Sequence, residues 1–340
     1  MAQPWTRLRP KRRHGSKVPA AVSQIGTPQP FADLVRSAAR AALEEAVPDE
    51  ALRSLTTRAL AKPPYVLSRQ QLRAAPLVLG AYEAAGGNGD AGGRAAAAME
   101  FLTAALHLFD GLADGDTESS STDIQVGLAL HYSTAFVLDR IRMIDGSRAD
   151  WAPIYRLMNV VCAGQQRDLD LQLQPKPTLD EAKTMTFQKT GAFGEALTLA
   201  GALAAGAQPD LCRNLALLGQ YLGARGQLID DATDASPEAV DTSDIRLRKK
   251  TLPIAFFIGQ AGKDSYDNLR VHLSDSRPIA PEVEEALRRA IQDSGGLEMT
   301  LVYASWLRIK ATQLLEEMQV NGCRTELLRA HLASTEDLPV

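Results

Sequence analysis

Two clusters of aspartates, more than a hundred residues apart, constrain the fold of this chain more than any other feature. The first contains Asp110 and Asp114, and the second contains Asp230, Asp231 and Asp234. In both clusters aspartates recur four residues apart, which places their carboxylates on one face of a helix. Each cluster lies in an apolar, helix-like stretch with no lysine or arginine among its members. Carboxylates grouped in this way repel one another unless a cation lies between them.

A single aspartate pair at helical spacing is most often part of a solvated helix face. Here, however, leucine and phenylalanine side chains surround the first cluster, and Leu228 and Ile229 precede the second. Two such clusters facing one cavity form a site for hard divalent cations. Mg²⁺ held by a few carboxylates completes its coordination with substrate phosphates. The pattern therefore indicates chemistry on a phosphorylated substrate.

The composition favours an all-α fold. Alanine and leucine, both good helix formers, are abundant, hydrophobic residues make up 45% of the 340 residues and aromatic residues only 5%. Apolar periodicity predicts helices over residues 31–43, 49–61, 69–85, 94–114, 123–143, 151–173, 179–205, 209–235, 251–262, 281–294, 297–320 and 324–334. Short polar segments separate them, and none resembles a linker. We therefore expect residues 31–340 to form one large helical bundle.

Residues 1–30 form a basic tail. They contain six lysines and arginines, five prolines and no acid, so we predict that this segment is disordered. It has no apolar region of the kind found in a secretion signal. Both a weak electrostatic tether to an anionic surface and an inert tail remain open.

The net charge, the cysteines and the length of the apolar runs limit the possible partners and cellular location of the protein. The net charge of −4 argues against nucleic acid as a partner. The three cysteines are widely spaced, which suggests neither a zinc site nor a disulfide framework and favours the cytoplasm. No apolar run reaches the length of about 20 residues that spans a membrane.

Four further segments accompany the acidic clusters. They are GQQRDL at 164–169, KTG at 189–191, Gln227 three residues before Asp230, and KKTLP at 249–253. KTG interrupts a predicted helix, where Gly191 permits a kink or a close backbone approach. Lysines brought near metal-binding acids would contact the phosphate oxygens that the metal leaves free.

In this order the motifs resemble those of the trans-isoprenyl diphosphate synthases, also called the polyprenyl synthetase family. The resemblance covers roughly residues 60–262. It implies a large all-α bundle with a central pocket, a homodimer, and Mg²⁺ bound between both acidic clusters and an allylic prenyl diphosphate. The implied reaction is ionisation of the prenyl C–O bond, with the leaving diphosphate stabilised by Mg²⁺ and lysines.

The resemblance also implies roles for individual residues. The implied metal ligands are Asp110, Asp114 and Asp230, with Asp231 and Asp234 binding directly or through water. The implied substrate contacts are Lys189 and Lys249 on the diphosphate, Thr190 in the same KTG segment, and Gln165 and Gln227 lining the upper pocket.

The sequence departs from the chain-elongating members of the family where those members bind isopentenyl diphosphate. In place of their GGKRLRP segment stands Ser68–Ala74, in which only Arg73 matches a basic position. In place of their arginine pair after the first aspartate motif stands the acidic and hydroxylated stretch 118–123, and Gly111 replaces a usual aspartate. Each lost charge-assisted contact costs roughly 1.5–3 kcal/mol. The departures therefore argue against efficient use of isopentenyl diphosphate.

Several reactions are consistent with a sequence that keeps the residues for the allylic substrate but lacks those for isopentenyl diphosphate. The cation could react with its own double bonds or with water, as in a class I terpene synthase. It could instead pass to another acceptor, as in the ComQ-like relatives that prenylate a peptide tryptophan, or to isopentenyl diphosphate in ordinary elongation. A non-catalytic partner subunit is a further alternative, against which the intact lysine motifs argue.

Residues before the first cluster bear on the chain length of the substrate. Ala105 and Leu106 lie one turn before Asp110, and Phe101 lies one turn deeper. In the family a bulky aromatic next to this motif shortens the pocket, so Ala105 favours a C15 to C20 substrate with Phe101 as the floor. His107 is three residues from Asp110, although a lone histidine in an apolar helix is most often a core residue.

Overall fold

The computed structural model describes residues 29–68, 72–113, 121–143, 146–239, 244–263, 265–275 and 277–334. Within these ranges there is no β-strand, and a single isolated bridge pairs Arg142 with Arg148. The predicted all-α fold is therefore confirmed. Most of the proposed tail and all of residues 69–71 and 114–120, Asp114 included, lie outside the described residues.

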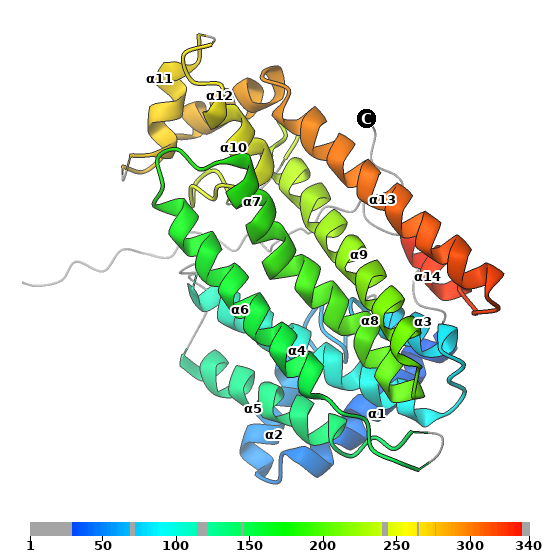
Figure 1. The fold of residues 1–340 in the computed structure, drawn as a ribbon. Coiled ribbons are helices and arrows are strands. Elements are labelled where there is room, and N and C mark those ends of the chain that lie inside the picture. The colour runs from blue at the N-terminus through cyan, green and yellow to red at the C-terminus, as the bar shows by residue number, and fades with distance from the viewer. Residues whose placement is uncertain are drawn as a thin grey trace, which may run out of the picture.

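The helices run from one end of the described chain to the other (Figure 1). In chain order they are α1 (Gln29–Ala46), α2 (Glu50–Leu60), α3 (Ala75–Ala84), α4 (Asp90–Ala113), α5 (Ser121–Leu138), α6 (Ala152–Gln172), α7 (Leu179–Thr186), the π-helical turn η1 (Phe187–Gly191), α8 (Ala192–Ala205), α9 (Pro209–Ala235), α10 (Leu252–Gly259), α11 (Asp267–Arg270), the 3₁₀ turn η2 (Val271–Leu273), α12 (Pro281–Asp293), α13 (Gly296–Val320) and α14 (Glu326–Ala333).

The long helices α6, α8 and α9 lie side by side, and α13 packs along the outer side of α9 (Figure 1). Helix α4 lies behind them and packs against α1, α3, α5 and α8. Small residues let α8 and α9 approach closely, since a Cβ added to Gly194 would lie 2.2 Å from the carbonyl oxygen of Gly219. This close packing fixes α9, which carries the second acidic cluster, relative to the helix that follows the KTG segment.

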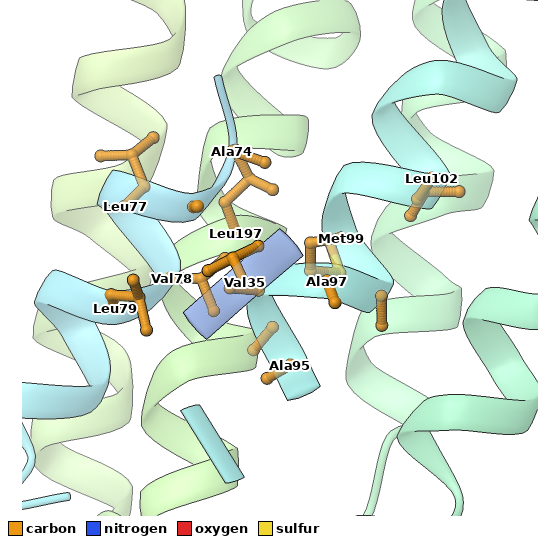
Figure 2. Close-up of a cluster of buried hydrophobic side chains, with 14 of the residues drawn as sticks. Val35, Ala74, Leu77, Val78, Leu79, Ala95, Ala97, Met99, Leu102 and Leu197 are labelled. Atoms are coloured by element: carbon orange, nitrogen blue, oxygen red, sulfur yellow. The ribbon is translucent and has the colours of Figure 1, made fainter. Parts of the chain in front are cut away.

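The main core surrounds α4. Figure 2 shows Val35 of α1, Val78 of α3, Met99 of α4 and Leu197 of α8 meeting in it, all of them buried. By length and composition α4 is apolar enough to cross a membrane, yet 61% of its most apolar window is buried inside the protein. Packing against neighbouring helices thus accounts for its apolar sequence.

Several predicted helix boundaries were wrong, and the helix predicted to reach residue 143 ends at Leu138. The helix predicted from residue 69 begins at Ala75, where the buried carboxylate of Glu100 accepts hydrogen bonds from the backbone N–H groups of Ala74 and Ala75 at 2.9 Å each. Helix α4 begins at Asp90, although residue 94 was predicted as its start. Its early glycines are packing residues, because a Cβ on Gly92 would lie 2.5 Å from the ring of Tyr82.

Candidate active site

The helix that carries the KTG segment is interrupted, as the sequence predicts. Phe187–Gly191 forms a π-helical turn between α7 and α8, a rare geometry that often occurs at functional sites. The close backbone approach expected at Gly191 is absent, since an added Cβ there would meet only ordinary contacts of 3.5 Å. The approach occurs instead at Gly164 of α6, where a Cβ would lie 2.3 Å from the backbone nitrogen of Lys189.

This turn directs Lys189 toward the first acidic cluster. Its ammonium group lies 2.8 Å from Oδ2 of Asp168 on α6 and 3.4 Å from Oδ1 of Asp110 on α4. Burial lowers the pKa of Lys189, but attraction to Asp168 and Asp110 outweighs this, so that the pKa is raised overall. Lys189 is therefore a fixed positive charge beside the first cluster.

A chain of hydrogen bonds links the same turn to the second cluster. The hydroxyl of Thr190 donates to Oε1 of Gln227 at 2.7 Å, and Nε2 of Gln227 donates to Oδ1 of Asp231 at 2.7 Å. The other carboxylate oxygen of Asp231, Oδ2, is buried and has no hydrogen-bond partner within the described chain. Burial raises the pKa of Asp231 well above its usual value.

The two other aspartates of the second cluster are also destabilised as anions. Desolvation raises the pKa of Asp230 to about 6, with a further contribution from Asp244, while Arg73 opposes it. The pKa of Asp234 is also raised to about 6, by burial and then by Asp244 and Asp230. Asp230 is exposed to solvent, whereas its neighbour Asp231 is buried.

Lys249 approaches this cluster from the segment before α10. Its ammonium group lies 3.6 Å from Oδ1 of Asp244, and both side chains are largely buried. The charge of Lys249 lowers the pKa of Lys189 as well as that of Asp234. The two lysines, Asp110 and the second acidic cluster therefore converge on one site.

The sequence model of the family described as polyprenyl synthetase matches residues 123–291. This range contains the GQQRDL and KTG segments, the second acidic cluster and the KKTLP segment. The chain belongs to the polyprenyl synthetase family.

Individual proteins are similar to this chain in sequence or in fold. A geranylgeranyl diphosphate synthase of Mycobacterium tuberculosis (strain ATCC 25618 / H37Rv) is 25% identical over 238 residues, which is 65% of this chain and 68% of that protein. A polyprenyl synthetase from Streptomyces coelicolor A3(2) has the same fold, with a TM-score of 0.74 and 22% identity over 92% of this chain and 100% of that one. A polyprenyl synthase from Caulobacter crescentus CB15, complexed with calcium and isoprenyl diphosphate, gives a TM-score of 0.69 and 20% identity over 92% and 97% of the two chains.

Enzymes of the polyprenyl synthetase family generally use Mg²⁺, and the acidic residues of this member fit such an ion. Oδ2 of Asp231 is a buried oxygen without a partner in the described chain, and Asp230 and Asp234 repel one another. A hard divalent cation binds oxygen ligands, so it would give Oδ2 of Asp231 a partner and reduce the repulsion between Asp230 and Asp234. The described residues alone form no group of three potential ligands at metal-binding spacing, but Asp114 lies outside them.

Arg73 lies within electrostatic range of Tyr65, Glu100 and His107, and we call these four described residues the Arg73 wall. The charge of Arg73 shifts the pKa of the other three and also that of Asp230. Arg73 is the one cation in this wall. Glu100 is buried and its pKa is raised to about 7 by burial.

The remaining predicted substrate contacts differ in exposure. Leu106 is half-buried, whereas Phe101 and Ala105 are fully buried in the main hydrophobic cluster. Gln165 is partly buried, and its Nε2 lacks a hydrogen-bond partner in the chain described. Their roles in binding a prenyl chain stay predictions.

Two site residues were missed from the sequence. Asp168 lies inside the GQQRDL segment, yet nothing in its spacing shows that it pairs with Lys189. Asp244 lies in the polar loop after the second cluster, where no helical periodicity places it beside Lys249. Both contacts arise from tertiary packing.

Proposed function

We propose that this protein ionises an allylic prenyl diphosphate of 15 to 20 carbons in a Mg²⁺-dependent reaction, as a class I terpene synthase on a prenyl-synthase scaffold. The observation that supports this most is the asymmetry of the site. The allylic side retains Lys189, Lys249 and both acidic clusters in contact or in electrostatic range of one another. Around Arg73, by contrast, the described neighbours Tyr65, Glu100 and His107 add no second lysine or arginine.

In this proposal Asp110, Asp114, Asp230, Asp231 and Asp234 hold the Mg²⁺, which when bound neutralises the leaving diphosphate. Lys189 donates hydrogen bonds to diphosphate oxygens, and Asp168 keeps its ammonium group in position. Lys249 contacts the diphosphate from the segment before α10. Because these charges are fixed before the C–O bond breaks, they stabilise the developing negative charge without reorganisation. Leu106 and its apolar neighbours shield the allylic cation from water.

Chain elongation is the reaction that the names of the relatives suggest, but it requires a second diphosphate. With Arg73 as the one cation in the described wall, several charge-assisted contacts of roughly 1.5–3 kcal/mol each would be missing. Transfer of the cation to an uncharged acceptor, such as an indole or a peptide, is the second candidate, since such a group needs no cationic site. A non-catalytic partner subunit would have no use for the retained lysine pairs.

We further propose that the protein is a cytoplasmic homodimer. Ile124, Leu128 and Tyr132 are exposed and recur every four residues along α5. A second copy covering this apolar stripe would remove it from water. The three cysteines are free, as in a reducing compartment. Light scattering would give twice the mass of the chain if the proposal is correct.

A product assay tests the reaction. Purified protein is incubated with farnesyl or geranylgeranyl diphosphate in magnesium buffer, with and without isopentenyl diphosphate. We expect a hydrocarbon or alcohol to form without the co-substrate, and a longer prenyl diphosphate formed only with it would overturn the proposal. Asp230→Asn should abolish turnover, whereas the matched control Asp210→Asn, on an exposed aspartate of the same helix, should retain it.

A further inference from the structure

His107 belongs to the Arg73 wall, and the proposed ionisation gives it no role. It lies on α4 three residues before Asp110, on the helix face that also carries Thr103 and Glu100. Its ring centroid is 6.1 Å from that of Tyr65, with 40° between the ring planes. The imidazole is therefore positioned by an aromatic neighbour close to the diphosphate end of the site.

Charged groups from three elements act on this imidazole. They are Arg73 from the segment before α3, Asp110 from α4 and Lys189 from η1. The pKa of His107 is lowered to about 4, first by burial and then by the charges of Arg73 and Lys189, while Asp110 opposes them. His107 is thus neutral near pH 7 and has one ring nitrogen with a free lone pair.

We propose that His107 is the proton acceptor that ends the reaction, taking a proton from the carbon next to the cationic centre of the ionised prenyl chain. This inference depends on the proposed function. Two facts of geometry support it: the imidazole lies one helical turn before Asp110 on the same helix face, and Lys189, which we place on the leaving diphosphate, lies 3.4 Å from Oδ1 of Asp110.

In the proposed step a C–H bond breaks and its electron pair becomes the new C=C bond, so the carbocation becomes an olefin. The lone pair of the imidazole nitrogen forms the new N–H bond and leaves an imidazolium ion. Asp110 and the released diphosphate are anions near this ion and stabilise it. The proton then passes to diphosphate, which restores the neutral imidazole as the products leave.

A strong base is unnecessary here, because a carbocation readily gives up a neighbouring proton. Position and a free lone pair decide which group accepts it. A lysine or arginine at residue 107 would lack that lone pair, and it would also attract a second diphosphate. The neutral imidazole therefore suits olefin formation and opposes elongation at the same time.

Substitutions at residue 107 test this inference. His107→Gln and His107→Ala are compared with the control His131→Gln, since His131 on α5 also contacts a tyrosine ring, that of Tyr132, at 5.7 Å but is exposed. Products and diphosphate are measured with geranylgeranyl diphosphate in magnesium buffer. We expect the yield of the main olefin per diphosphate released to fall at least about tenfold in both His107 variants. Free imidazole should restore it in His107→Ala, and the control should match wild type.

Unchanged product ratios in folded His107 variants would show that diphosphate or water accepts the proton, and the inference would be wrong while the proposed function stood. If the wild-type protein released no diphosphate from any allylic substrate, the proposed function itself would fail. Thermal melts establish that the variants fold. Should neither fold, Tyr65→Leu removes the ring that positions His107 and should alter the same product ratio, and an unaltered ratio would overturn the inference.

Discussion

At the scale of single residues, the buried ion pair between Lys189 and Asp168 connects stability to function. The ammonium group is held at 2.8 Å from a carboxylate that is almost completely buried. A buried charge that loses its partner is strongly destabilising. The sequence predicted that Lys189 is functional but gave no sign of Asp168, because their pairing depends on how α6 packs against η1.

Lys189→Met should therefore affect both properties. Loss of one diphosphate donor lowers the rate of diphosphate release by roughly 100-fold or more, and the unpaired Asp168 lowers the free energy of unfolding by about 3–5 kcal/mol. The double variant Lys189→Met/Asp168→Asn should regain most of the stability but none of the activity. Urea denaturation and a diphosphate assay measure the two effects, with Lys183→Met, at a partly exposed lysine on α7, as control. If Lys189→Met were as stable as the wild type, the buried ion pair between Lys189 and Asp168 would not contribute to stability.

Glu100 makes stability depend on pH. Its folded pKa of about 7 lies above the ordinary value of 4.5 because it is buried. The folded state therefore binds the proton more tightly than the unfolded state, and the stabilisation present below pH 4.5 is lost as the pH rises toward 7. From pH 4.5 to 8, the unfolding free energy of Glu100→Gln relative to wild type should rise by roughly 3 kcal/mol. A difference that does not change with pH would rule out a buried, titrating Glu100.

At the scale of elements, the decisive contact is between α6 and the π turn. The sequence indicated an interrupted helix at KTG, but it could not show that Gly164, far away in the chain, is the residue that permits the close approach. An absent side chain leaves no periodic signal. The start of α3 was mispredicted for a related reason, since the carboxylate that accepts its first N–H groups comes from α4.

Gly164→Ala should displace the π turn, because the new methyl would lie 2.3 Å from the backbone nitrogen of Lys189 and 2.6 Å from the carbonyl carbon of Gln188. We expect a loss of about 1–3 kcal/mol in stability and slower diphosphate release. Gly259→Ala on α10 is the matched control, since a Cβ there meets nothing within 4 Å. If the two variants are equally stable and release diphosphate at the same rate, the close approach between α6 and the π turn does not affect function.

The segment before α10 offers a second test at this scale. Lys250 is fully buried, and its ammonium group donates to the carbonyls of Arg248 and Leu273 at 2.9 Å and of Gln172 at 3.3 Å. It thereby fixes the backbone next to Lys249, where Arg248 adopts a left-handed φ of 56°.

Lys250→Met leaves these carbonyls without their donor, at a cost of about 1–3 kcal/mol for each buried group. Because Lys249 is then less well positioned, we expect KM for the allylic diphosphate to rise more than kcat falls. Steady-state kinetics and a thermal melt measure both effects. If Lys250→Met is clearly destabilised but its KM equals that of the wild type, Lys250 has no role in substrate binding.

At the scale of the whole molecule, the order of motifs along the sequence was enough to predict the all-α fold and the family. The apolar periodicity of α4, α8 and α9 made these helices predictable, because each buries a long apolar face. What the sequence could not give is which acidic groups share the site, since Asp168, Asp244 and Glu100 reach it through packing between distant helices. The division into a tail at 1–30 and a domain at 31–340 stays a prediction.

The central claim is that this protein cleaves the C–O bond of an allylic diphosphate without binding isopentenyl diphosphate. The most direct test is the rate of diphosphate release from geranylgeranyl diphosphate in magnesium buffer as isopentenyl diphosphate is added. We predict saturable release in its absence and no acceleration on its addition. Release that requires isopentenyl diphosphate and yields one extended chain for each diphosphate set free would contradict the account.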